Sequence, residues 1–250
     1  MKVALVYSGQ PRNLKDCYAN HVHHLMRNNP DCDFDVFGHM WIDHDKHFWD
    51  KHPNRGSWSD DDTMFMLRKW KPKRIVFETP KVFESNLTPE AAIPHPIQNT
   101  LSMLYSIEQA NNARNEYEKQ EGVVYDCVIR LRTDLYFGDN ANINLSTIDL
   151  KKMNVVERAS HRSYGCNDQF AISNPVNMNA YSGTYSLVNE LVESGCVINP
   201  ECLVGYNSFV KHSMECVSHE RGPGDRWQFT LYRDRYAPYH SGTFSKDYTA

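Results

Sequence analysis

Several classes of protein are excluded by what the sequence lacks. No stretch approaches the roughly 18 consecutive apolar residues that a membrane-spanning helix needs, so we expect no membrane span. The seven cysteines include no Cys-x-x-Cys pair, which argues against a zinc knuckle and against a thioredoxin-type redox site. Their odd number and wide scatter favour reduced, mostly buried thiols over a disulfide framework.

A strong charge of one sign and a glycine-rich phosphate loop are also missing. The formal net charge of −4 supplies no general attraction for nucleic acid, so we expect no nucleic-acid partner. Neither a Gly-x-Gly-x-x-Gly pattern nor a Gly-Lys-Ser/Thr loop occurs, which disfavours a Rossmann dehydrogenase and a P-loop kinase. Met1 leads directly into an apolar run without the pattern of a signal peptide, and we expect a cytoplasmic protein.

Short apolar runs alternate with helical patterns along the first half of the chain. The runs are typical of strands covered on both faces and lie at residues 2–7, 34–40, 74–77 and 123–131. Helical patterns lie at 14–27 and 97–120. This order predicts an α/β fold, with a mostly parallel, twisted sheet flanked by helices in a single domain over 1–250. The second half is less regular, with a strand at 169–172 and helices near 176–194 and 201–216.

Three of the expected strands end in polar residues. These ends are Ser8 to Arg12, His39 to Trp41 and Arg132 to Asp134. Ligands of parallel sheets bind beyond the carboxyl ends of the strands, so we expect the three ends to form one crevice. The polar stretch from His44 to Asp62 is long for a plain connection and predicts either a site loop or a surface segment.

The strand that leads to Asp134 carries two arginines. Side chains alternate along a strand, so Arg130, Arg132 and Asp134 would share one face. Guanidinium groups on an apolar strand are costly unless they meet carboxylates or phosphates. Arg130 could belong to a structural ion-pair network. Arg132 and Asp134, nearer the strand end, would face a diphosphate and its divalent metal ion.

A family resemblance rests on four segments. Residues 125–137, Tyr-Asp-Cys-Val-Ile-Arg-Leu-Arg-Thr-Asp-Leu-Tyr-Phe, resemble the metal-binding strand of nucleotide-sugar glycosyltransferases with the GT-A fold. They look closest to viral and bacterial surface-glycan transferases in which Arg-x-Arg-x-Asp stands at the usual Asp-x-Asp site. Residues 8–12 resemble the nucleotide-side loop, residues 167–172 the acceptor-side Asp before a strand, and residues 200–203 the Pro-Glu that opens a later helix.

This resemblance implies an enzyme that moves a sugar from a UDP- or GDP-linked donor to a glycan acceptor, with Mn²⁺ or Mg²⁺. Residues 1–137 would form the nucleotide-sugar-binding half, and residues 138–250 the acceptor-side half. Asp168 would be the catalytic base, while Asp134 and the late histidine His219 would hold the metal, with His240 as a weaker alternative. The donor-binding residues would be Ser8, Gly9, Gln10, Arg12, Arg132 and Asp134.

Other interpretations stay open at this point. Asp168 could instead cap the turn before its strand. Arg132, at the place of the first Asp of the usual motif, also fits a non-catalytic glycan- or nucleotide-binding module on the same fold. A sulfotransferase with a catalytic histidine is a further alternative. His21 and His24 would share a helix face, but no nearby carboxylate completes a metal site with them.

Overall fold

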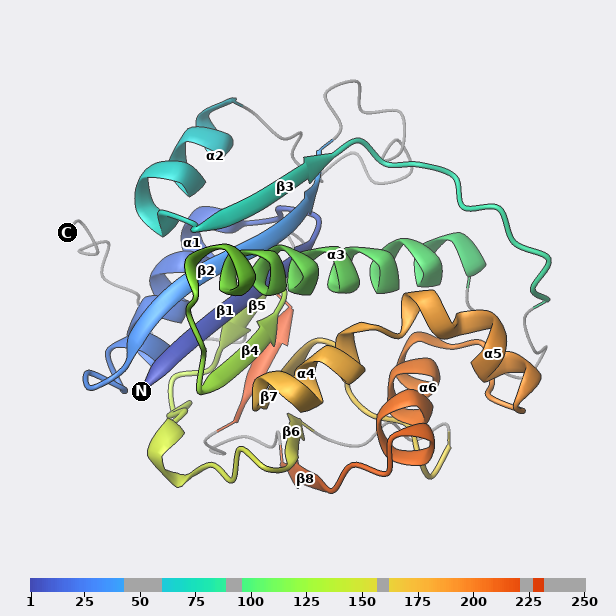
Figure 1. The fold of residues 1–250 in the computed structure, drawn as a ribbon. Coiled ribbons are helices and arrows are strands. Elements are labelled where there is room, and N and C mark those ends of the chain that lie inside the picture. Colours follow the sequence, from blue (N-terminus) through green and yellow to red (C-terminus); the bar gives the residue numbers. More distant parts are fainter. Residues whose placement is uncertain (43–59, 89–95, 157–161, 221–226, 232–250) are drawn as a thin grey trace.

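A seven-stranded sheet in the order β3-β2-β1-β4-β7-β6-β8 forms the centre of the protein (Figure 1). The computed structural model describes residues 1–42, 60–88, 96–156, 162–220 and 227–231. The seven strands are β1 (Lys2–Gly9), β2 (Asp33–Trp41), β3 (Arg74–Glu78), β4 (Cys127–Leu131), β6 (Met153–Val156), β7 (Phe170–Ser173) and β8 (Cys216–His219). A second, two-stranded sheet pairs β5 (Leu135–Phe137) with β9 (Phe229–Leu231).

Only β7 runs against the other strands of the seven-stranded sheet. Strands β1, β2, β3 and β4 are mutually parallel, β7 is antiparallel to both β4 and β6, and β8 is parallel to β6. The reversal places the first residue of β7, Phe170, beside the last residue of β4, Leu131. The expected α/β architecture, a mostly parallel sheet flanked by helices, is confirmed.

Helices cover both faces of this sheet (Figure 1). The first two helices of the chain each continue into a π-helical turn: α1 (Leu14–His21) into residues 22–26, and α2 (Asp60–Phe65) into residues 66–70. The others are α3 (Ile97–Glu121), α4 (Pro175–Ser182), α5 (Val188–Glu193) and α6 (Pro200–Gly205), which a π-helical turn at 206–211 extends. Short 3₁₀ turns lie at Leu145–Thr147 and Tyr185–Leu187.

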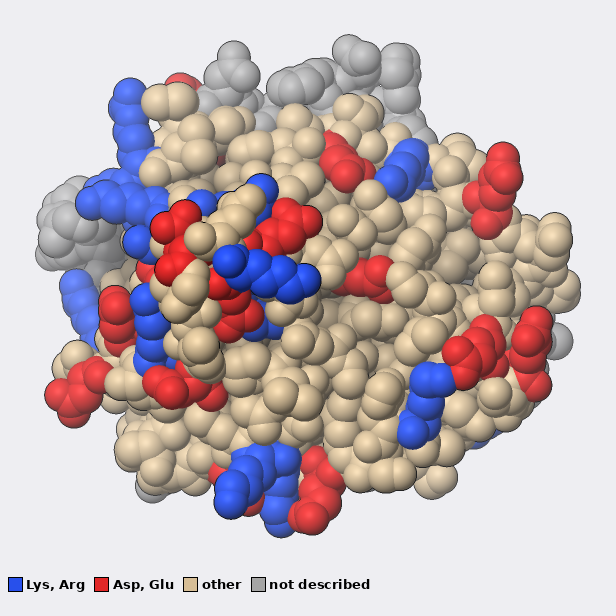
Figure 2. Space-filling view, viewed as in Figure 1, with Lys and Arg blue, Asp and Glu red and all other residues tan. Residues whose placement is uncertain are grey.

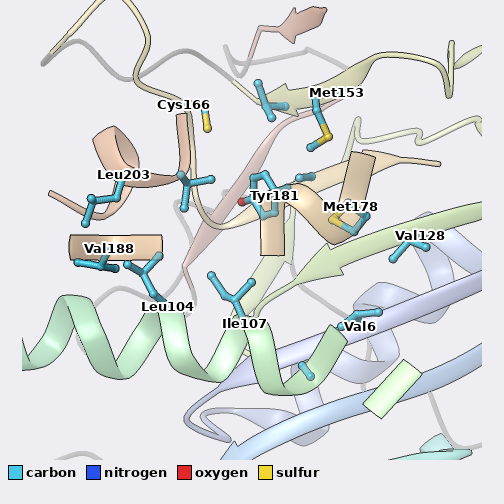
Figure 3. Packing of buried hydrophobic residues seen from close by; sticks show 14 of the residues in the cluster. Val6, Leu104, Ile107, Val128, Met153, Cys166, Met178, Tyr181, Val188 and Leu203 are labelled. Carbon is cyan, nitrogen blue, oxygen red and sulfur yellow. The ribbon is translucent and has the colours of Figure 1, made fainter. Parts of the chain in front are cut away.

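The apolar run of β1 supplies side chains to both faces. Val3, Leu5 and Tyr7 join one buried cluster with Leu14 and Leu25 of the α1 segment. Ala4 and Val6, on the opposite face, pack in a second cluster against α3, α4 and α6. Figure 3 shows Leu104 and Ile107 of α3 together with Met178 and Tyr181 of α4 in this second cluster. Because one sheet separates both clusters, the described residues form a single domain.

The helices of the second half are shorter than expected. The helix predicted over 176–194 is broken after Ser182, where the Thr184 hydroxyl donates to the Tyr181 carbonyl at 2.8 Å. The Asn207 amide donates to the Ala180 carbonyl at 2.7 Å, so side chains satisfy the helix end. The helix predicted over 201–216 also ends early, because Met153 N donates to Glu215 O and the residues beyond form β8.

Contact between backbones fixes α6 against the segment that precedes Asp168. A Cβ atom at Gly205 would lie 2.0 Å from Tyr164 O and 3.0 Å from Gly165 Cα. No flexible side chain can relieve that overlap, so we expect Gly205→Ala to lower the free energy of unfolding by about 3 kcal/mol. Urea unfolding measures the change. Gly183→Ala is the matched comparison: its Cβ would lie 3.2 Å from the nearest atom, Asn179 O, a tight contact but not an overlap, so it should lower the free energy of unfolding by less. An unchanged midpoint for Gly205→Ala would contradict the contact.

All seven cysteines have free thiols. Only Cys32 and Cys216 are partly exposed, and the other five are buried. The prediction of reduced, mostly buried thiols is thereby confirmed. Burial, with a smaller contribution from Cys202, raises the pKa of Cys196 to about 12. Its thiol therefore stays protonated at neutral pH and is a poor nucleophile.

The surface carries charges of both signs. On the face shown in Figure 2, Lys and Arg side chains are interspersed with Asp and Glu, and other residues form most of the centre. This face therefore offers no broad basic patch of the kind that binds nucleic acid. Within the described ranges, no helix has both the length and the apolar character that crossing a membrane requires.

Candidate functional site

The predicted site residues meet at one edge of the sheet, the carboxyl edge of its parallel strands. Strand β1 ends there at Gly9 and β4 at Leu131. Strand β7 begins beside Leu131, because Leu131 pairs with Phe170. Strand β8 reaches the same edge, since its last residue, His219, pairs with the last residue of β6, Val156. The ends of β1, β4 and β8 and the start of β7 thus lie at one edge of the sheet.

The loop from Ser8 to Arg12 is tied to the end of β4. Gly9 has a φ of +112°, which side chains rarely allow, so the chain can turn sharply at the end of β1. The Thr133 hydroxyl donates to Gln10 O at 2.6 Å and accepts from Arg12 N at 3.3 Å. Sequence reasoning missed Thr133, for which the only signal was its position between two candidate residues. Its hydroxyl holds Arg12 and Asp134 near each other.

A bidentate ion pair joins Arg132 to Asp134. The Nε and Nη2 atoms of Arg132 each donate to one carboxylate oxygen of Asp134, both at 2.7 Å. The Nη1 atom of Arg12 lies 3.7 Å from Asp134 Oδ2, and the Asp134 side chain is only 1% exposed. Burial alone would lower the pKa of Arg132, but Asp134 outweighs it and holds that pKa above its ordinary value.

A turn, rather than the continued strand, brings Arg132 and Asp134 together. Strand β4 stops at Leu131, and Leu135 N donates to Arg132 O at 3.4 Å. The expected alternation therefore holds only as far as Arg130. Because the backbone folds back, the Asp134 carboxylate turns toward its own arginine instead of projecting beyond the sheet.

Arg130 is a buried cation that forms no ion pair with a carboxylate of the described residues. It is 1% exposed, and its Nη2 atom donates to Ser8 Oγ at 3.3 Å. Its Nε and Nη1 atoms have no hydrogen-bond partner among the described residues, and no carboxylate there forms an ion pair with it. Burial lowers the pKa of Arg130, while Tyr181 and Asp168 oppose this effect. The expected ion-pair alternative is therefore absent from the described part of the chain.

Asp168 lies between β6 and β7, two residues before β7 begins. The turn before β7 is capped by its neighbour, since the Asn167 side chain accepts from Gln169 N at 2.9 Å. Asp168 itself is 6% exposed, and its charge helps to raise the pKa values of Arg130 and Arg132. The capping role considered for Asp168 thus belongs to Asn167. Its carboxylate is close enough to Arg130 and Arg132 to act on both electrostatically.

The helix expected at Pro200-Glu201 supports this segment. Helix α6 begins at Pro200, and Asn199 caps it by accepting from Glu201 N at 3.0 Å and Cys202 N at 3.2 Å. Cys166 N in turn donates to Glu201 O at 3.2 Å. The first turn of α6 therefore fixes the chain two residues before Asp168.

His219 lies at the same edge as Asp134, but on β8, the last strand of the sheet. Strands β7 and β6 separate β8 from β4, which corresponds to roughly 14 Å between β4 and β8. His219 Nε2 lies 3.2 Å from Asn154 Oδ1, and its ring stacks on Trp227 with a centroid distance of 3.8 Å. A metal-binding role for His219 stays a prediction. His240 and residues 44–59 of the stretch from His44 to Asp62 lie outside the described residues.

The arrangement around Asp134 does not fit a divalent cation. Such an ion is held by carboxylate oxygens, but both oxygens of Asp134 are engaged by Arg132. The guanidinium groups of Arg132 and Arg12 would repel an ion placed there. In the residues that the structure describes, no group of three or more His, Cys, Asp or Glu could hold a metal ion. The expectation of Mn²⁺ or Mg²⁺ stays a prediction.

The helix that carries His21 and His24 holds the chain after Asp134. His21 Nε2 lies 2.6 Å from the Leu135 carbonyl oxygen, and its Nδ1 lies 3.0 Å from Tyr7 Oη. His24 Nδ1 lies 2.9 Å from the Ala141 carbonyl oxygen. These residues thus fix the position of Asp134 through its neighbour. Sequence reasoning missed this role, although the polar residues Asn20, His21 and His24 follow one another on this helical segment.

Comparison with known proteins gives a distant likeness. No family model matches the chain, and no curated protein matches it. Among solved structures, the chain is similar to a glycosyltransferase involved in the glycosylation of the major capsid of PBCV-1. The TM-score is 0.39 and the identity 11%, over 88% of this chain and 81% of that chain. At these values the likeness carries no conclusion about the chemistry of the site, which rests on the residues described above.

Proposed function

We propose that this protein is a glycosyltransferase that moves a sugar from a nucleoside-diphosphate donor to a hydroxyl group of a glycan acceptor. One observation supports this function above all others: Arg12, Arg130 and Arg132 gather at one sheet edge with the carboxylates of Asp134 and Asp168. Three guanidinium groups exceed two carboxylates by one positive charge. A site with this charge suits an anionic donor, although the chain as a whole has a formal net charge of −4.

The arginines would act on the leaving group. When the bond between the sugar and the diphosphate breaks, negative charge develops on the phosphate oxygens. Guanidinium groups already fixed at the site stabilise that charge without reorganising. The loop from Ser8 to Arg12 would contact the nucleotide side of the donor. Residues 1–137 would thus supply the donor half of the site, and residues 138–250 the acceptor half.

Asp168 would act on the acceptor. The acceptor hydroxyl oxygen forms the new bond to the anomeric carbon, the bond to the diphosphate breaks, and the hydroxyl proton passes to the Asp168 carboxylate. Asp168 suits this role because its carboxylate makes no hydrogen bond to the described residues and lies at the start of β7, beside the end of β4.

Removal of the Asp168 charge tests the proposed base. We expect Asp168→Asn to lower turnover by about 10²- to 10⁴-fold, because a positioned base contributes about that factor. Nucleotide release from a panel of UDP- and GDP-sugars, with glycan acceptors, measures turnover, and calorimetry with UDP and GDP measures donor binding. Donor affinity should stay within a few-fold of the original protein. Asp31→Asn, at an exposed aspartate, is the matched control.

Full turnover in a folded Asp168→Asn protein would contradict the role of Asp168. Failure of every sugar donor to bind or to release nucleotide would contradict glycosyl transfer itself. Including a 3′-phosphoadenosine nucleotide in the panel distinguishes a sulfotransferase, which would bind that ligand instead.

The bidentate ion pair between Arg132 and Asp134 also favours a second candidate, a glycan- or nucleotide-binding module without turnover. Both oxygens of Asp134 are occupied by its own arginine, so the charge is balanced before any ligand arrives. Such a module would bind a nucleotide in the same calorimetric experiment, and no acceptor in the panel would then cause nucleotide release.

A further inference from the structure

The site proposed to bind a donor diphosphate contains its own cations. Asp134 is only 1% exposed, and the two hydrogen bonds from Arg132 satisfy both of its oxygens. Arg12 lies 3.7 Å from the same carboxylate. A divalent cation would need the negative charge of Asp134, but the guanidinium groups of Arg132 and Arg12 already offset that charge. Guanidinium groups stay protonated near neutral pH.

Hydrogen-bond donors also outnumber acceptors here. Arg132 uses Nε and Nη2 on Asp134, which leaves its Nη1 for another acceptor. Arg130 is completely buried, yet its Nε and Nη1 atoms have no partner among the described residues. A buried guanidinium in this state is costly unless an acceptor arrives. Phosphate oxygens are the acceptors that match the planar fork of arginine best.

We propose that Arg130 and Arg132, with Arg12 beside them, take the place of a divalent cation, so that this site binds a nucleoside diphosphate without metal. The inference rests on the function proposed above and deepens it. Arg132 replaces the positive charge of an ion by a guanidinium fixed to Asp134. Asp134 then serves to orient Arg132 rather than to coordinate metal.

Binding of UDP and GDP in the presence of a chelator tests this directly. Calorimetry with EDTA and with MnCl₂ should give dissociation constants that agree within about threefold for the better nucleotide. Arg132→Gln should weaken binding in EDTA by about tenfold or more, because one charged fork is lost. Arg132→Lys keeps the positive charge but loses the planar pair of donors, so its affinity in EDTA should lie between that of the original protein and that of Arg132→Gln. Arg27→Gln, at an exposed arginine, is the matched control.

Arg130→Met separates ligand binding from folding. Methionine fills much of the volume without the charge, so thermal unfolding should show a protein at least as stable as the original. The same variant should bind the nucleotide about tenfold or more weakly in EDTA. Loss of stability together with unchanged binding would show that Arg130 is only structural and would overturn its part in the proposal.

The remaining outcomes distinguish this inference from the proposed function. Tenfold or greater tightening by MnCl₂ in the original protein would overturn the metal-free site and leave glycosyl transfer standing. Unchanged binding in a folded Arg132→Gln protein would overturn it as well. If neither UDP nor GDP binds in either buffer, both the metal-free site and the proposed glycosyl transfer are contradicted.

Discussion

Asp134→Ala is expected to abolish sugar transfer and to lower the free energy of unfolding by about 3–5 kcal/mol. Asp134 is the buried counter-charge of Arg132, and Arg12 lies 3.7 Å away. Its removal takes away the carboxylate to which Arg132 donates two hydrogen bonds and leaves the buried guanidinium of Arg132 without that counter-charge. Uncompensated buried charge is among the most destabilising changes that a single substitution can make.

Chemical denaturation and nucleotide release measure the two effects separately. Asp31→Ala, at an exposed aspartate, is the control and should change neither. Arg132→Met combined with Asp134→Ala removes both charges, so it should recover much of the stability while activity stays absent. An Asp134→Ala protein that is fully active and equally stable would contradict the role given to this residue.

Acidification is expected to destabilise the protein by several kcal/mol between neutral pH and pH 4. Burial is the main reason that the pKa of His21 and the pKa of His39 are each lowered from 6.5 to about 4. Both side chains are completely buried. His21 contacts Tyr7 and the Leu135 carbonyl, while His39 contacts Ser106 and lies 3.7 Å from Glu78.

The direction follows from which state binds the proton. Below pH 6.5 the two histidines bind protons in the unfolded state but stay neutral in the folded state. Their contribution to the free energy of unfolding is therefore fully present above pH 6.5 and is lost as the pH falls toward 4. A lowering from 6.5 to about 4 corresponds to about 3 kcal/mol for each residue as an upper estimate. Urea unfolding at a series of pH values measures this loss.

Substitution of one histidine isolates its share. His39→Gln should show a shallower dependence of unfolding free energy on pH than the original protein, because one of the two groups no longer titrates. His23→Gln, at an exposed histidine of the same helical segment as His21, should leave the dependence unchanged. Equal unfolding free energies at pH 7 and pH 5 in the original protein would contradict the argument.

The sheet was predictable where strands are buried on both faces. The runs that became β1, β2 and β4 are apolar because side chains on both faces lie in clusters, and this pattern is visible without any partner strand. Strands β5 and β9 have three residues each, and β6 and β8 have four. Such short elements are stabilised by partners distant in the sequence, which local pattern does not reveal.

The site was predictable as a set of residues but not as a set of contacts. Arg132, Asp134 and Asp168 could be chosen because polar residues at strand ends are typical of binding sites. The contacts within the site depend on the turn after Leu131, because this turn brings the Arg132 side chain into hydrogen-bond contact with Asp134. Sequence spacing alone did not indicate that turn. Nor could it show that Asn167, rather than Asp168, caps the start of β7.

Strand β1 also determines how the protein can be attached to a surface. Its first residue, Lys2, lies at the edge opposite the site, where the Met1 amino group donates to Asp31 O at 3.2 Å. The seven residue steps of this strand place roughly 23 Å between Lys2 and Gly9. A biosensor chip or an affinity tag joined at this end would therefore leave the carboxyl edge facing the solution. Immobilised protein should then report nucleotide binding with little interference from the support.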